Sequence, residues 1–64
     1  MEIRLLRLPE VIRAVGLRRS AIYARVAAGT FPAPVSIGAR SVAWVSDDVA
    51  KWIDAQVKAS RNDT

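Results

Sequence analysis

The sequence predicts a mainly α domain that carries one small β-hairpin, and three observations lead to this fold class. Two stretches with apolar residues at helical spacing are separated by a short turn that contains Gly16. The segment 30–45 then contains prolines and alternating apolar residues, a pattern typical of extended chain. A third stretch of helical spacing begins after Ser46. The predicted order is therefore helix, turn, helix, hairpin, helix.

The first two helices are expected at about Pro9–Val15 and about Arg19–Ala28. Proline is favoured at the first helical position, and Glu10 complements the positive end of the helix dipole. Gly16 and Gly29 are expected to end the two helices, because the left-handed conformation that closes many helices suits glycine best. The apolar residues at helical spacing are Val11, Ile12 and Val15 in the first helix and Ile22 and Val26 in the second, with Leu17 in the turn between them.

The hairpin is expected from two short alternating segments, Val35–Ile37 and Val42–Trp44. A four-residue turn, Gly38–Ser41, would join them and would carry Arg40 at or near its tip. Thr30–Pro34, which precedes the hairpin, cannot continue a helix because its prolines lack the amide donor.

The third helix is expected at about Asp47–Ala59, with Ser46 as its N-cap. Asp47 and Asp48 would lie in the first turn, where the dipole favours negative charge. This helix would close a single domain, residues 1–59, and residues 60–64 would form a frayed polar tail. Its expected apolar stripe is Val49, Trp52, Ile53 and Val57, and its expected ion pairs are Asp47 with Lys51 and Asp54 with Lys58.

The positive charge is concentrated in the middle of the chain. The net charge is +4, yet the stretch from Val11 to Ser46 contains five arginines and no carboxylate. An arginine tract without compensating acids produces a directed positive field, which favours a polyanionic partner. Chance clustering of solvated charges is the alternative interpretation. The five residues are Arg13, Arg18, Arg19, Arg25 and Arg40.

Composition excludes several classes of protein. The sequence contains no cysteine and no histidine, which removes disulfides, thiolate metal sites and the commonest general base. We therefore expect no enzyme, no cofactor, no metal and no small-molecule substrate. The longest apolar run is too short to cross a bilayer, so a soluble, cytoplasmic protein without a membrane partner is expected.

Two short helices joined by a glycine-containing turn of about three residues are typical of a helix-turn-helix, and the hairpin that follows makes the order that of a compact winged helix-turn-helix. Within Leu5–Gln56, the most specific motifs are Leu6–Val11, Arg19–Ser20 with Ile22–Tyr23, Gly29 with Phe31–Pro32 and Pro34–Val35, and Ser41–Trp44. On these motifs the stretch resembles the AlpA family of phage and prophage regulators, within the wider excisionase and MerR-like winged-helix group. The resemblance implies a small DNA-binding protein without enzymatic activity, acting as a transcriptional activator or as an excision directionality factor on a mobile element.

The sequence departs from this family at two places. Such sequences usually have serine at position 18, which would cap the second helix. Arg18 cannot accept that hydrogen bond, so the cap is either lost or supplied otherwise, at a cost of about 1 kcal/mol. At position 24 the family often has arginine, whereas here Ala24 is followed by Arg25 at a commonly apolar place. The details of base contact are therefore expected to differ.

A helical wheel assigns roles on the second helix. With Ile22 and Val26 facing the core, the outward face carries only small side chains, which let the helix backbone lie close to the floor of a groove. Arg19 and Tyr23 flank one side and Arg25 the other, although Arg25 could instead lay its stem over apolar surface and Tyr23 could simply pack with its hydroxyl in water. The outward residues are Ser20, Ala24 and Ala27.

Double-stranded DNA is therefore the expected partner. Arg18 and Arg19 lie at the helix start, where unsatisfied amides also favour a phosphate, and Arg40 would reach a phosphate or the minor groove as part of the wing. Trp44 and Trp52 are expected in the core, and Asp47–Asp48 is explained by helix capping rather than by metal binding. The predicted DNA-contacting residues are Arg18, Arg19, Ser20, Tyr23, Arg25, Arg40 and Ser41.

One helix and one wing offer a contact area of only about 600–1,000 Å², so either a homodimer or cooperative assembly on adjacent DNA sites is expected. Two alternatives stay open beside a transcriptional regulator. One is an excisionase-like recombination directionality factor, which also binds DNA. The other, from a different class, is a basic protein–protein interaction module or antitoxin.

Overall fold

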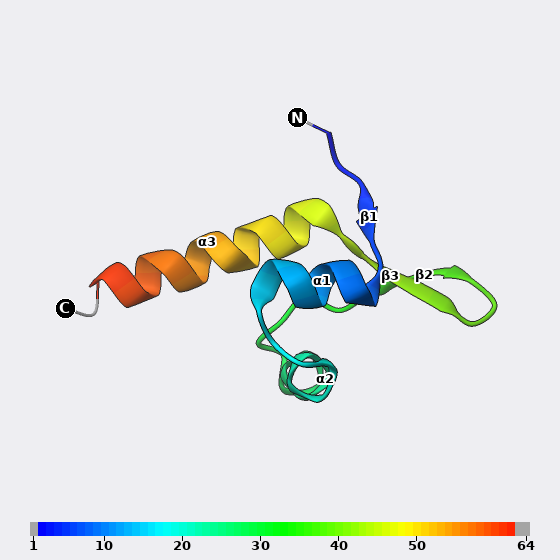
Figure 1. Ribbon diagram of the computed structural model, residues 1–64, viewed down its shortest axis with the longest axis horizontal. Coiled ribbons are helices and arrows are strands. Elements are labelled where there is room, and N and C mark those ends of the chain that lie inside the picture. The colour runs from blue at the N-terminus through cyan, green and yellow to red at the C-terminus, as the bar shows by residue number, and fades with distance from the viewer. Residues whose placement is uncertain (1, 63–64) are drawn as a thin grey trace.

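The computed structural model describes residues 2–62 of the chain, and in this part three helices and three short strands follow one another (Figure 1). The predicted fold class, mainly helical with a small antiparallel hairpin in the order of a winged helix-turn-helix, is confirmed. The elements are β1 (Leu5–Leu6), α1 (Leu8–Val15), α2 (Arg19–Ala28), β2 (Val35–Gly38), β3 (Ser41–Val45) and α3 (Ser46–Asn62).

The helix-turn-helix corner is confirmed almost to the residue. α2 has the predicted bounds, and α1 begins one residue earlier than expected, so that Pro9 is its second residue. Glu10 accepts a hydrogen bond from the backbone N–H of Arg7 at 3.1 Å, which closes the start of α1. Gly16 and Gly29 end the two helices at φ 74° and φ 79°, the left-handed region that glycine adopts without steric cost.

The hairpin belongs to a three-stranded antiparallel sheet with the order β1-β3-β2. β1 was not predicted, because two residues are too short to show an alternating pattern; Leu5 is opposite Val45 and Leu6 is opposite Trp44. The predicted four-residue turn is wrong in length. Gly38 and Ser41 pair as strand residues, so only two residues, 39 and 40, form the turn, and an irregularity in β2 lies between Ser36 and Gly38.

A small apolar core joins α1, α2, β3 and α3. Trp44, Ile22 and Val11 are completely buried, as expected for Trp44 and for the inward face of α2. Trp52 is half-buried at the edge of this core, where its ring and that of Phe31 form a T-shaped pair with centroids 4.9 Å apart. The other buried core residues are Leu6, Phe31 and Val49, and Leu8, Ile12, Val15, Leu17, Val26 and Ile53 pack against them in part.

The two tryptophans also fasten the proline-containing segment between α2 and β2. The indole N–H of Trp44 donates to the carbonyl of Pro32 at 2.9 Å, and that of Trp52 donates to the carbonyl of Thr30 at 2.8 Å. Prolines have no amide N–H, so this segment cannot form a regular strand ladder. The indole N–H groups from β3 and α3 donate to its carbonyls instead. These bonds fix the path of the chain from α2 into the hairpin.

α3 begins at Ser46 and ends at Asn62, so the expected end at Ala59 is too early by three residues. Ser46 is the first residue of the helix rather than the residue before it, and its hydroxyl accepts the backbone N–H of Arg4 at 2.8 Å. The helix extends beyond the core in Figure 1, which leaves Val57 40% exposed despite its place in the expected apolar stripe. Of the expected tail, Ser60–Asn62 is helical, and Asp63 and Thr64 lie outside the described residues.

Candidate nucleic-acid interface

The outward face of α2 is exposed and built from small side chains, as the helical wheel predicted. Ser20, Ala24 and Ala27 are exposed, whereas Ile22 on the opposite face is completely buried and Val26 is half-buried. The buried pair anchors α2 to the core, so the outward face is held at a fixed orientation. Its low profile lets another molecule approach the helix backbone closely.

The start of α2 is positively charged. Arg18 occupies the N-cap position with extended geometry, φ −79° and ψ 163°, and no side chain in residues 2–62 caps the first amides of the helix. Of the two outcomes expected for this cap, lost or supplied otherwise, the described residues show the lost cap. Arg18 and Arg19 are both exposed beside these amides, and the helix dipole adds to their charge. The combination favours an anion at this end of α2.

Arg19 and Tyr23 form a connected pair on the flank of α2. The guanidinium carbon of Arg19 lies 5.9 Å from the centre of the Tyr23 ring, a cation–π distance. The Tyr23 ring in turn meets the ring of Trp44 edge-on, with centroids 6.0 Å apart and planes inclined by 62°. Tyr23 keeps 38% of its surface exposed, so it both packs against the core and faces solvent. Sequence patterns do not reveal the contact with Trp44, because the two residues are far apart along the chain.

The remaining predicted site residues lie elsewhere on the surface. Arg25 is exposed in the last turn of α2, away from Arg18. Arg40 is exposed in the turn between β2 and β3, at the end of the hairpin, which Figure 1 shows projecting from the body of the molecule separately from α2. Ser41 is half-buried and paired with Gly38, so it is less accessible than the other predicted residues. The structure thus brings Arg18, Arg19, Ser20 and Tyr23 together on one element and leaves the hairpin residues on another.

The ion pairs among residues 2–62 involve neither α2 nor the hairpin. Arg4 pairs with Glu10 at 3.9 Å, and the expected helical pairs on α3 are confirmed, Lys51 with Asp47 at 3.0 Å and Lys58 with Asp54 at 3.0 Å. The hydrogen bond to the Asp47 carboxylate raises the pKa of Lys51. Within residues 2–62, none of the five arginines between Val11 and Ser46 has a carboxylate within ion-pair distance, so their charge is uncompensated; they are Arg13, Arg18, Arg19, Arg25 and Arg40.

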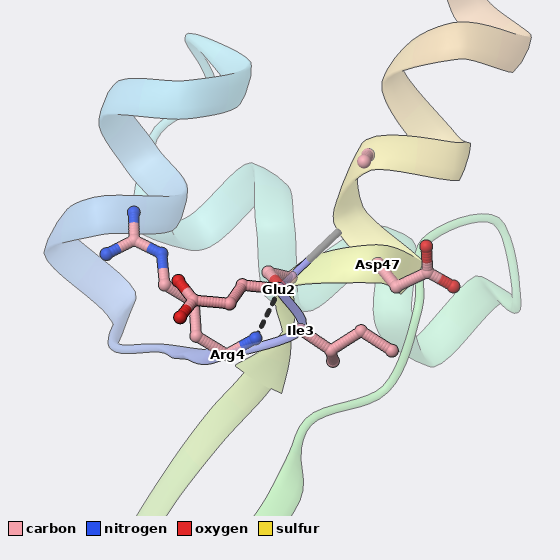
Figure 2. Close-up of a pocket in the computed structure, with 6 residues that line it drawn as sticks. Glu2, Ile3, Arg4 and Asp47 are labelled. Carbon is pink, nitrogen blue, oxygen red and sulfur yellow. Dashed lines mark hydrogen bonds between the residues drawn. The ribbon is translucent and has the colours of Figure 1, made fainter.

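A shallow cavity of about 200 Å³ lies apart from α2, between the start of the chain and the first turn of α3 (Figure 2). Its polar lining includes Glu2, Arg4 and Asp47, and the carboxylates of Glu2 and Asp47 point away from one another in Figure 2. Among the described residues, no group of three or more acidic side chains could hold a metal ion. No helix in residues 2–62 is long and apolar enough to cross a membrane.

Comparison with known proteins assigns the family. The chain matches the family model of the prophage CP4-57 regulatory protein (AlpA) over residues 4–57. It is 43% identical over 54 residues to a protein of Enterobacteria phage P4 named "Uncharacterized protein ORF88", with 84% of this chain and 61% of that protein covered. The chain therefore spans about three fifths of the length of this phage relative.

A second relative carries a functional name. The chain is 32% identical over 62 residues to the DNA-binding transcriptional activator AlpA of Escherichia coli (strain K12), with 88% of this chain and 89% of that protein covered. The resemblance drawn from the sequence is thereby confirmed. Because the family model covers most of the chain, including both helices of the corner and the hairpin, this protein belongs to the AlpA family of prophage regulatory proteins.

Proposed function

We propose that this protein is a sequence-selective transcriptional regulator that binds double-stranded DNA. The observation that carries the proposal is the uncapped start of α2, where exposed Arg18 and Arg19 lie beside free helix amides and have no carboxylate partner in the described chain. The name of the Escherichia coli relative, a DNA-binding transcriptional activator, supports the same function. It also favours regulation of transcription over a role in excision.

The proposed binding mode uses two elements. α2 enters the major groove, which is wide enough for a helix, and its small outward face lets the helix lie close to the base edges. Arg18 and the first amides of α2 hold a phosphate. Arg40 at the end of the hairpin contacts the backbone or the minor groove beside this site. Arg25 adds a second phosphate contact from the other end of α2.

Binding rather than catalysis is the proposed activity. The sequence has neither histidine nor cysteine, and the proposed DNA-binding unit, residues 1–59, contains no cofactor motif. A protein that acts on DNA is expected in the cytoplasm, at the nucleoid. A basic protein-interaction module or antitoxin is the competing class, and an acidic protein partner would then meet the same arginines.

A randomised duplex selection tests the proposal. We expect the wild-type protein to enrich a defined sequence, and we expect the double variant Arg18→Ala, Arg19→Ala to lose most of the affinity for it. The matched control, Lys51→Ala with Lys58→Ala, removes two charges that are already ion-paired on α3 and should leave binding unchanged. An absence of any duplex preference, together with unchanged binding by the arginine variant, would exclude a DNA-binding regulator and favour the protein-interaction class.

The small contact area of one helix and one wing implies more than one copy on the operator. We propose cooperative binding of monomers to adjacent sites, with a preformed homodimer as the alternative. Sedimentation velocity with and without a two-site duplex separates the two. A stable dimer in the absence of DNA would contradict the cooperative version.

A further inference from the structure

The outward face of α2 has little capacity to identify bases by hydrogen bonds. Of the outward residues, only Ser20 carries a donor or acceptor on its side chain, because Ala24 and Ala27 offer methyl groups alone. Methyl groups can contact a thymine methyl but cannot distinguish guanine from the other bases. Apart from the single hydroxyl of Ser20, any hydrogen-bonded reading of sequence by α2 has to come from the longer side chains on its flanks.

Among the arginines of α2 in the described chain, Arg19 is the one held in place by another side chain. Its guanidinium lies over the Tyr23 ring, the Tyr23 ring abuts Trp44, and the completely buried Trp44 is hydrogen-bonded to the carbonyl of Pro32 at 2.9 Å. Three successive contacts thus connect an exposed guanidinium to the core. Arg25, by contrast, is exposed, and within residues 2–62 it forms neither a cation–π contact nor an ion pair.

We propose that Arg19 is the base-reading residue of α2, recognising one guanine in the major groove, and that Tyr23 is its positioning residue. This inference rests on the DNA-binding function proposed above and divides the two neighbouring arginines by role. Arg18, at the N-cap beside the free amides, contacts a phosphate and carries affinity without sequence information. Arg19 carries the sequence information.

The chemistry of the arginine side chain fits this role. A guanidinium has a rigid fork of N–H donors, and guanine presents two acceptors, O6 and N7, to the major groove at matching spacing. The cation–π contact with the Tyr23 ring involves the charge of the guanidinium and uses none of its N–H donors, which stay available to a base. A guanidinium already held near an anchored ring loses less rotational freedom on binding, so more of the hydrogen-bond energy appears as discrimination.

The substitution Arg19→Lys tests the assignment, because it keeps the positive charge and removes the fork. The probes are the duplex selected by the wild-type protein and a set of duplexes in which each G·C pair is exchanged in turn, with affinities read by fluorescence anisotropy. We expect Arg19→Lys to lose discrimination at one G·C pair by about 10- to 100-fold, while affinity for an unrelated duplex changes little. Arg18→Ala is the matched control and should weaken all duplexes alike.

Two variants of Tyr23 separate its ring from its hydroxyl. Tyr23→Phe keeps the ring under Arg19 and should leave the preference for the selected duplex unchanged. Tyr23→Leu removes the ring and should lower discrimination at the same G·C pair by about two- to fivefold, since an exposed cation–π contact is weak. Thermal unfolding followed by circular dichroism confirms that each variant is folded under the assay conditions.

Failure of this inference about Arg19 and Tyr23 can be distinguished from failure of the proposed DNA-binding function. If the wild-type protein shows no duplex preference, the DNA-binding function and this inference both fall. If the wild-type protein is selective but Arg19→Lys weakens every duplex equally, only the inference is overturned, and Arg19 is a phosphate contact. A relaxed preference in Tyr23→Phe would likewise overturn the positioning role, because the hydroxyl would then read the base.

Discussion

The salt dependence of DNA binding gives the sharpest quantitative prediction. Raising the salt concentration should weaken duplex binding in proportion to the number of phosphates that the protein neutralises. Once Arg19 is assigned to a base, the proposed binding mode places three exposed arginines, which have no carboxylate partner in the described chain, against phosphates: Arg18, Arg25 and Arg40. The lysines of α3 are not counted, because their charges are already neutralised by aspartates.

The magnitude follows from these contacts. At about 0.9 per phosphate on duplex DNA, three contacts predict a slope of about −2.7 for log affinity against log salt. Affinity should then fall about 40-fold between about 50 mM and about 200 mM salt. A fourth contact, from exposed Arg13 on α1, would steepen the slope to about −3.6 and the loss to about 150-fold.

Fluorescence anisotropy with a labelled duplex at several salt concentrations measures the slope. The double variant Arg18→Ala, Arg40→Ala should reduce the steepness of the slope by about 1.8, since it removes one proposed contact from each element. Lys51→Ala with Lys58→Ala should leave the slope unchanged. A wild-type slope shallower than about −1 would refute the reasoning, because at most one phosphate would then be neutralised.

Three further predictions follow from particular contacts. Arg18→Ser should supply the missing cap of α2 and stabilise the fold by about 1 kcal/mol in urea unfolding while weakening DNA binding; unchanged stability would contradict the account of the cap. Trp52→Phe should cost about 1 kcal/mol or more in the same assay, because the carbonyl of Thr30 loses its indole donor, and a neutral result would show that this bond adds no stability. Affinity for duplex DNA should be constant from about pH 6 to about pH 8, because the sequence has no histidine to titrate there; an affinity change in this range would show that another group titrates at the interface. Lys51 does not change this expectation. Its pKa is raised, so its contribution to stability is present below the ordinary lysine pKa and is lost only as the pH rises through the raised value.

Local interactions allowed the sequence by itself to determine the helical part of this protein. The ends of α1 and α2 could be predicted because Gly16 and Gly29 adopt a backbone conformation that other residues resist, and this preference belongs to the residue itself. The inward position of Ile22 and the ion pair between Asp47 and Lys51 were equally predictable, since both depend on the period of a single helix. The position of Arg19 on the flank of α2 followed from the same periodicity, whereas the exposure of Arg40 followed from its place in the hairpin turn.

Contacts between distant segments decided the rest, and only the tertiary structure contains them. The strand β1 exists because Leu5 and Leu6 find partners on β3, not because of any pattern within two residues. The arrangement of Arg19, Tyr23 and Trp44 depends on how α2 and β3 pack around the core to which Ile22 and Trp44 both belong. A periodic pattern specifies which face of a helix or strand is buried. Which residues that face then contacts depends on how all the elements pack together, and this packing can be seen only in the tertiary structure.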